Sequence, residues 1–342
     1  MATSCDHNSS TKHAHRSTEG DGFLSRPFAR ATLADHSELE LSLNRTGQPF
    51  EDEVLRFFGL KDTEVTASRS NHPQYELPQI HHALARCFPD WKPAFEGGGD
   101  RCQQLWAPKD RRIEIAPGKF REYLSDGTRF YLLPNGGRRV ALFEESEYQP
   151  GWFQFSLIGP REERSMIRAE LEAIKRWRRR NHYLRGQAIR ADGTLLRKAA
   201  GLTWNDVVLD DAVRRSLLVN VVDFLKLRKT FKRNGVPQKR GILLYGPPGT
   251  GKTLIGKVLA GLGGTTFVYV TAGDVRNPCA LRIAFKLART LRPVIIFLED
   301  LDFYAADRHL TRDQSVLGEL LAQMDGLERN DGLVVLATTN DL

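Results

Sequence analysis

The sequence has few cysteines, no long apolar run and no metal-binding motif of paired ligands. Its four cysteines, Cys5, Cys87, Cys102 and Cys279, are scattered over 342 residues. The absence of a C-x-x-C pair argues against a disulfide framework or a zinc site and is typical of a reducing cytoplasm. No apolar run approaches the roughly 18 to 20 residues that a membrane-spanning helix needs, and the N-terminus lacks an apolar signal segment. These absences predict a cytoplasmic protein without a membrane anchor in this sequence.

The composition is that of a globular protein, with 41% hydrophobic and 27% charged residues. A chain of this length can form two or three domains. Residues 1–22 are dominated by small and polar residues and predict a disordered tail. Residues 23–200 predict a smaller α+β domain with antiparallel strands that binds a client or partner, and residues 201–342 predict an α/β domain.

The N-terminal half predicts helices at 50–59 and 76–87. Between about 110 and 158 the spacing of the apolar residues changes to a period of two, which is typical of strands. Asn135-Gly136-Gly137 is a strong tight-turn signal between two of the strand-like runs. A helix from Pro160 to about Asn181 follows, and a hairpin over 188–196 is expected to close this unit. The predicted strands are 112–115, 128–133, 140–143 and 152–158, and the residues expected on the buried side of the helix are Met166, Leu171, Ile174 and Trp177.

Positive charge is concentrated in one segment. The net charge is +8, and residues 161–198 contain 12 Lys/Arg against 5 Asp/Glu, an excess of 12 − 5 = 7. The densest run, Lys175 to Arg180, contains an aromatic residue and could bind phosphates and stack a base. A run of this kind is more often a solvated helix face, and the helical spacing of Trp177 favours packing. Nucleic acid is therefore a less favoured partner.

The C-terminal half alternates strands and helices. Strands are predicted at 241–245, 265–271, 294–298 and 333–338, separated by helices at 252–262, 280–290 and 313–325. A lead-in helix begins after Asp210, a good N-cap, and a second lead-in helix ends at Gly235. This alternation predicts a parallel sheet flanked by helices, with a ligand at the carboxyl ends of the strands.

A phosphate-binding loop joins the first of these strands to its helix. The residues are Gly246-Pro247-Pro248-Gly249-Thr250-Gly251-Lys252-Thr253, followed by Leu254 in the helix. Glycines let the backbone fold around an anion, and the helix presents its positive end to the same place. Lys252 is expected to reach the outer phosphates, and the hydroxyl of Thr253 is expected to bind Mg²⁺. A glycine-rich turn that binds nothing is the alternative, and the flanking strand and helix argue against it.

Acids and an amide follow the third and fourth strands. Glu299 and Asp300 come directly after the apolar run 294–298, where one carboxylate can hold Mg²⁺ and the next can deprotonate an attacking water. Asn340 follows the fourth strand and could hold the same water against the terminal phosphate.

With these motifs in place, residues 202–342, about two fifths of the chain, resemble the AAA-family ATPases. The matching segments are the phosphate loop as Walker A, residues 297–302 as Walker B, residues 320–327 as the helix before sensor 1, and residues 337–340 as sensor 1, which carries Asn340. The resemblance implies a P-loop NTPase fold, ATP and Mg²⁺ as ligands, hydrolysis coupled to remodelling of a protein client, and a ring of identical subunits. It also implies that Asp206 and Val207 border the adenine.

Three features depart from that family. Walker B usually ends Asp-Glu, whereas this sequence has Glu299-Asp300. Aligned with that motif, the resemblance implies Glu299 as the metal ligand and Asp300 as the base. Residues 272–279 lack the aromatic element that protein-threading members place in the ring pore. The sequence stops after sensor 1, before the arginine finger and helical lid of similar proteins, so we expect a truncated chain whose first strand, 241–245, is an unpaired edge. Arg308 and Arg312 are interpreted as surface residues. The departures leave open a nucleotide-dependent switch with little hydrolysis.

Overall fold

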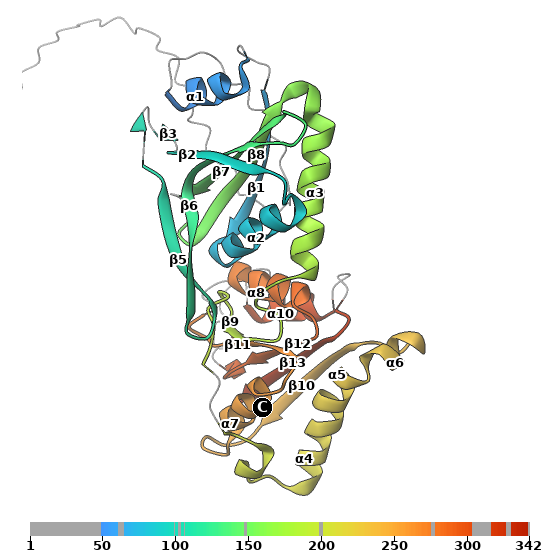
Figure 1. Cartoon of the computed structure of the whole chain (residues 1–342). Helices are drawn as coiled ribbons and strands as arrows, with labels where there is room; N and C mark the ends of the chain where they lie inside the picture. Colours follow the sequence, from blue (N-terminus) through green and yellow to red (C-terminus); the bar gives the residue numbers. More distant parts are fainter. Residues whose placement is uncertain are drawn as a thin grey trace, which may run out of the picture. The chain divides into compact units, whose positions relative to one another are not determined.

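The computed structural model describes residues 49–60, 65–98, 100–101, 104–105, 107–146, 149–197, 201–274, 278–302, 316–325 and 330–340 (Figure 1). The predicted tail at 1–22, Arg308 and Arg312 lie outside these residues. Within them, a six-stranded antiparallel sheet is followed in sequence by a five-stranded parallel sheet with flanking helices. The predicted fold class is thereby confirmed. Among the helices described, none is long and apolar enough to cross a lipid bilayer.

The antiparallel sheet has the order β1-β8-β7-β6-β2, and β5 pairs with β6 outside this path. Short 3₁₀ turns at Gln74–Glu76 and Arg161–Glu163 precede α2 and α3. The elements are α1 (Pro49–Phe58), β1 (Val65–Pro73), α2 (Leu77–Cys87), β2 (Lys92–Gly97), β3 (Asp100–Arg101), β4 (Gln104–Leu105), β5 (Lys109–Ala116), β6 (Lys119–Leu132), β7 (Arg138–Glu145), β8 (Trp152–Pro160) and α3 (Arg164–Arg180).

Both faces of this sheet are buried, because successive side chains of a strand point to opposite faces. On β6, Phe130 packs in the cluster that contains α1, whereas Tyr131 packs in the cluster that contains α2 and α3. The helix predicted after Pro160 is present as α3, and its buried residues are Ile167, Glu170, Leu171 and Ile174.

The prediction that Met166 is buried is wrong, because its side chain is 45% exposed. The buried stripe runs through Ile167 and Glu170 instead. Glu170 lies in this stripe because its carboxylate accepts hydrogen bonds from the fully buried Arg139, at 2.8 Å from Nε and 3.1 Å from Nη2. A stripe that passes through a charged residue cannot be recognised from apolar spacing alone. Trp177 packs against the core, as expected.

The parallel sheet has the order β10-β13-β12-β11-β9. Asp210 caps α4 as predicted, accepting a hydrogen bond of 2.8 Å from the Ala212 amide. The elements are β9 (Ala188–Arg190), α4 (Asp211–Leu217), the π-helix η4 (Leu218–Asp223), α5 (Phe224–Lys226), α6 (Arg228–Arg233), β10 (Lys239–Tyr245), α7 (Lys252–Ala260), β11 (Thr266–Val270), α8 (Pro278–Thr290), β12 (Val294–Leu298), α10 (Val316–Asp325) and β13 (Leu333–Thr339), with a 3₁₀ turn at Trp204–Asp206 before α4.

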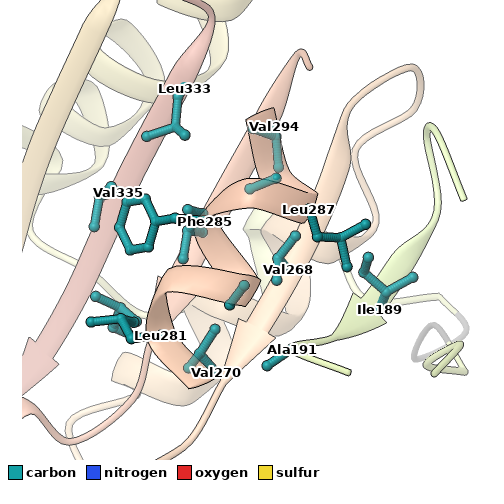
Figure 2. Packing of buried hydrophobic residues seen from close by; sticks show 14 of the residues in the cluster. Ile189, Ala191, Val268, Val270, Leu281, Phe285, Leu287, Val294, Leu333 and Val335 are labelled. Atoms are coloured by element: carbon teal, nitrogen blue, oxygen red, sulfur yellow. The ribbon is translucent and has the colours of Figure 1, made fainter. Parts of the chain in front are cut away.

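Helices cover both faces of the parallel sheet. One cluster packs α8 and α10 against the strands, and Figure 2 shows Phe285 of α8 lying among Val268, Val335 and Leu333. The other cluster packs α7 together with α4, η4 and α5 against the opposite face. Burial on both faces explains why β12 and residues 333–337 of β13 are continuous apolar runs, and all residues of both strands are buried.

The hairpin over 188–196 exists, with Ile189 bridged to Leu195, but the prediction that it closes the N-terminal unit is wrong for its first strand. Strand β9 pairs in parallel with β11 and forms an edge of the parallel sheet. Figure 2 shows Ile189 beside the core of that sheet. At the other end, β10 is the outermost described strand, and Leu243 and Tyr245 are 48% and 56% exposed. Among the described strands, β10 is thus at the edge of the parallel sheet.

Candidate functional site

The loop between β10 and α7 depends on two glycines in the left-handed region. Gly249 has φ +80° and Gly251, the N-cap of α7, has φ +89°. A Cβ placed on either glycine would meet nothing within 4 Å, so backbone conformation and not space requires glycine at both positions. The hydroxyl of Thr250 donates to the Pro247 carbonyl at 2.9 Å and closes the turn. Helix α7 therefore begins directly after a tightly folded loop.

Lys252 is the first residue of α7, and its ammonium lies inside the loop. It donates hydrogen bonds to the carbonyls of Gly246 at 2.6 Å and Pro247 at 2.9 Å. A third bond, of 2.9 Å, reaches Oδ1 of Asn340 at the end of β13. The parallel pairing of β10 with β13 places Asn340 beside the loop that follows β10. The structure thus brings two of the predicted site residues into direct contact.

Glu299 follows β12 and contacts two neighbouring elements. Its Oε1 accepts a hydrogen bond of 2.5 Å from the hydroxyl of Thr253 on α7. Its Oε2 accepts a hydrogen bond from the hydroxyl of Tyr269 on β11. Burial raises the pKa of the Tyr269 phenol, and the bond to Glu299 raises it further. The predicted metal pair, Thr253 and Glu299, is therefore adjacent, and Tyr269 is a neighbour that residue patterns did not indicate.

Asp300 occupies an unusual backbone position, because its φ of +53° is the only positive value of a non-glycine residue in the described part of the chain. Its amide donates to the hydroxyl of Thr338 at 2.9 Å. Burial raises the pKa of the Asp300 carboxyl, and the charges of Glu299 and Asp302 raise it further, against the opposing effect of Lys252. Left-handed backbone at a carboxylate is an observation from which a functional role can be inferred.

Asp302 ties the ends of β12 and β13 together, a role that residue patterns did not reveal. Its Oδ1 accepts hydrogen bonds from the hydroxyl of Thr339 at 3.2 Å and from the amide of Asn340 at 3.3 Å. Burial tends to raise the pKa of Asp302, but hydrogen bonds from its own backbone, from Asn340 and from Thr339 together hold it below its ordinary value. The position of Asn340 is thus fixed through Asp302.

The residues predicted beside adenine lie in and after the 3₁₀ turn before α4. The carboxylate of Asp206 accepts hydrogen bonds from the amide and hydroxyl of Thr203, which lower its pKa. The side chain of Val207 is buried in the cluster that contains α7, and Leu254 packs against that cluster. Contact of Asp206, Val207 and Leu254 with a nucleotide stays a prediction.

The donor set fits a triphosphate with Mg²⁺. An ammonium, a helix N-terminus and a folded glycine loop are groups that bind phosphate. Among the residues described, no three His, Cys, Asp or Glu side chains gather into a metal site. Mg²⁺ commonly binds through one or two protein oxygens together with substrate phosphates, which the Thr253–Glu299 pair can provide.

Comparison with known proteins agrees with this geometry. Residues 242–342 match the model of the "ATPase family associated with various cellular activities (AAA)". The chain is 36% identical over 152 residues to "ATP-dependent zinc metalloprotease FtsH 3" of Symbiobacterium thermophilum. This aligned segment covers 41% of the chain and 24% of that protein. The chain is 35% identical over 149 residues to "Protein SAV" of Sulfolobus acidocaldarius, covering 41% and 19%.

The chain therefore spans about a quarter or less of the length of these relatives. The matched segment contains the phosphate loop, both acids and Asn340, which are the residues that the fold brings together. Residues 242–342 therefore match the AAA family of P-loop ATPases, and the arrangement of the site residues in this segment agrees with that match.

Proposed function

We propose that this protein binds ATP with Mg²⁺, hydrolyses it, and couples the nucleotide cycle to remodelling of a protein client. The observation that carries the proposal is the convergence of Lys252, Thr253, Glu299 and Asn340, which come from α7 and from the ends of β12 and β13 and are joined by hydrogen bonds of 2.5 and 2.9 Å. The domain match and the family to which it belongs support ATP as the substrate.

Each residue has a role that its position supports. The loop from Gly246 to Thr253 would hold the phosphates, and Lys252 would exchange its bonds to loop carbonyls for bonds to phosphate oxygens. Thr253 and Glu299 would hold Mg²⁺, which neutralises the charge that develops on the phosphates. Asp300 would accept the proton of the attacking water, because its carboxyl directly follows the metal ligand at the end of β12 and interacts with Lys252 and Asn340. Asn340 would orient that water.

A second candidate is a switch that binds ATP but hydrolyses it slowly. The order Glu299-Asp300 puts the shorter side chain at the position of the base, in a left-handed backbone conformation. A base displaced by about 1 Å loses around 100-fold in rate. Measuring hydrolysis therefore decides between a motor and a switch.

We also propose that the antiparallel sheet with its helices binds the client or partner and that the ATPase domain begins before residue 188, because β9 belongs to the parallel sheet. The name of the FtsH relatives, "ATP-dependent zinc metalloprotease", is consistent with a protein client. Nucleic acid is less well supported, since Arg178 in the basic run is committed to an ion pair with Glu76. Assembly into a ring and a cytoplasmic location complete the proposal.

Phosphate release by the full chain tests hydrolysis. Lys252→Ala should abolish ATP binding, whereas Asp300→Asn should retain binding and lose about 100-fold or more in release. Lys257→Ala, at an exposed position of the same helix, is the matched control and should behave as wild type. Binding with release that neither site variant changes would reject hydrolysis and leave the switch. No binding by folded wild-type protein would reject both functions.

A further inference from the structure

Tyr269 completes the surroundings of the proposed metal ligand. Both oxygens of the Glu299 carboxylate accept hydrogen bonds, Oε1 from Thr253 and Oε2 from the hydroxyl of Tyr269. The two donors come from different elements, α7 and β11. Glu299 is therefore held between two elements of the domain.

The ring of Tyr269 is fixed by its neighbours. Tyr269 is directly opposite Phe297 in the parallel pairing of β11 with β12, and their rings stack with centroids 6.0 Å apart and an interplanar angle of 15°. Phe297 stacks in turn on Phe267, with centroids 5.8 Å apart. Helix α7 closes over Phe297 at Gly256, where an added Cβ would lie 2.7 Å from the ring. The phenol hydroxyl is thus directed at Glu299 by a packed aromatic stack.

The backbone next to Glu299 is tied to the same strand. The amide of Glu299 donates to the carbonyl of Val270 at 2.9 Å and continues the β11–β12 ladder by one residue. The remaining freedom of Glu299 lies in its side chain, which has one more rotatable bond than aspartate. A hydrogen bond to the far carboxylate oxygen removes that freedom. Replacing a group that holds a metal ligand in this way typically lowers metal affinity or activity 10- to 100-fold.

We propose that Tyr269 is a positioning residue that holds Glu299 in the orientation required to bind Mg²⁺ and so permits glutamate at the first acidic position of the Glu-Asp pair. This inference rests on the proposed function, because it assigns Tyr269 to the same ATP·Mg²⁺ site. If Tyr269 served packing alone, phenylalanine would replace it without effect, since the stack uses the ring and not the hydroxyl.

The test uses Tyr269→Phe in the full chain and measures phosphate release against Mg²⁺ concentration at saturating ATP. The Mg²⁺ concentration for half-maximal release should rise about tenfold, while ATP binding in EDTA should stay within about twofold of wild type. Tyr183→Phe is the matched control, because it removes another tyrosine hydroxyl, one that donates to the Tyr75 carbonyl at 3.1 Å away from the site. It should leave the Mg²⁺ dependence unchanged. An unchanged Mg²⁺ dependence in Tyr269→Phe would overturn the proposal.

A second measurement needs no nucleotide. Urea unfolding of wild type, Tyr269→Phe, Glu299→Ala and the double variant should show a coupling between the two substitutions of about fivefold in the unfolding equilibrium constant. Additive effects would overturn the proposal even if the Mg²⁺ dependence changed. Wild-type protein that folds, shows the coupling and binds no ATP would overturn the proposed function and the role in Mg²⁺ binding together, which distinguishes that failure from loss of the Tyr269 contact.

Discussion

Replacing Gly251 by alanine tests whether the phosphate loop needs the left-handed backbone that it adopts. Gly251 has φ +89° and ψ 10° at the N-cap of α7. The left-handed conformation costs a residue with a Cβ about 1 to 2 kcal/mol. No clash adds to this cost, because the new Cβ would meet nothing within 4 Å. The strain is therefore the whole expected effect.

That strain must appear either in stability or in affinity. If the variant keeps the loop conformation, the free energy of unfolding falls by about 1 to 2 kcal/mol, which lowers the melting temperature by about 2 to 8 °C for a domain of this size. If the loop relaxes instead, stability is retained and the strain returns when ATP binds, so that affinity falls about 5- to 30-fold. The losses of stability and of binding free energy should together amount to about 1 to 2 kcal/mol.

The assay combines thermal unfolding with calorimetric titration of ATP in the presence of Mg²⁺. Gly263→Ala is the matched control, because its Cβ would also meet nothing within 4 Å but its φ is not positive. The control should be neutral or slightly stabilised. Gly251→Ala that matches Gly263→Ala in both melting and affinity would refute the reasoning.

Three further outcomes are expected. Arg139→Met should lower the free energy of unfolding by about 3 to 5 kcal/mol in urea titration, because it leaves the Glu170 carboxylate buried without its partner; a loss below about 1 kcal/mol would contradict this. Burial lowers the pKa of His182 to about 4 and of His81 to about 3, so the unfolded chain binds more protons below pH 6.5. Stability should be independent of these residues above pH 6.5. Below pH 6.5 it should fall by about 1.4 kcal/mol per pH unit for each histidine, down to about pH 4 for His182 and about pH 3 for His81. Between pH 6.5 and pH 4, His182→Gln should remove half of this slope. Asn340→Ala should slow phosphate release about 100-fold; release at the wild-type rate would remove Asn340 from the site.

The parallel sheet and the phosphate loop could be predicted because their signals are local. The run 294–298 is apolar throughout and became β12 with those same bounds, since a strand buried on both faces has no polar position. The loop from Gly246 to Thr253 carries its backbone requirements in its glycines. The meeting of Lys252 with Asn340 followed from the rule that parallel strands end at one edge of the sheet.

Other features depend on pairing between distant segments. Strand β1 reads as polar, because its sequence includes Ser68, Arg69 and Asn71, yet it pairs along its whole length with β8. Strand β9 joins the parallel sheet through β11, more than 70 residues further along the chain. The contact of Tyr269 with Glu299 depends on the register of β11 against β12, which no local pattern encodes.

The measurement that tests the central claim most directly is calorimetric titration of the folded full chain with ATP, with and without Mg²⁺, in wild type and Lys252→Ala. Wild type should bind ATP in a Mg²⁺-dependent manner, because Thr253 and Glu299 are adjacent to the loop that holds Lys252. Lys252→Ala should release no binding heat. Well-folded wild-type protein that releases no heat with ATP and Mg²⁺, or equal heat from both proteins, would contradict a nucleotide site at this position.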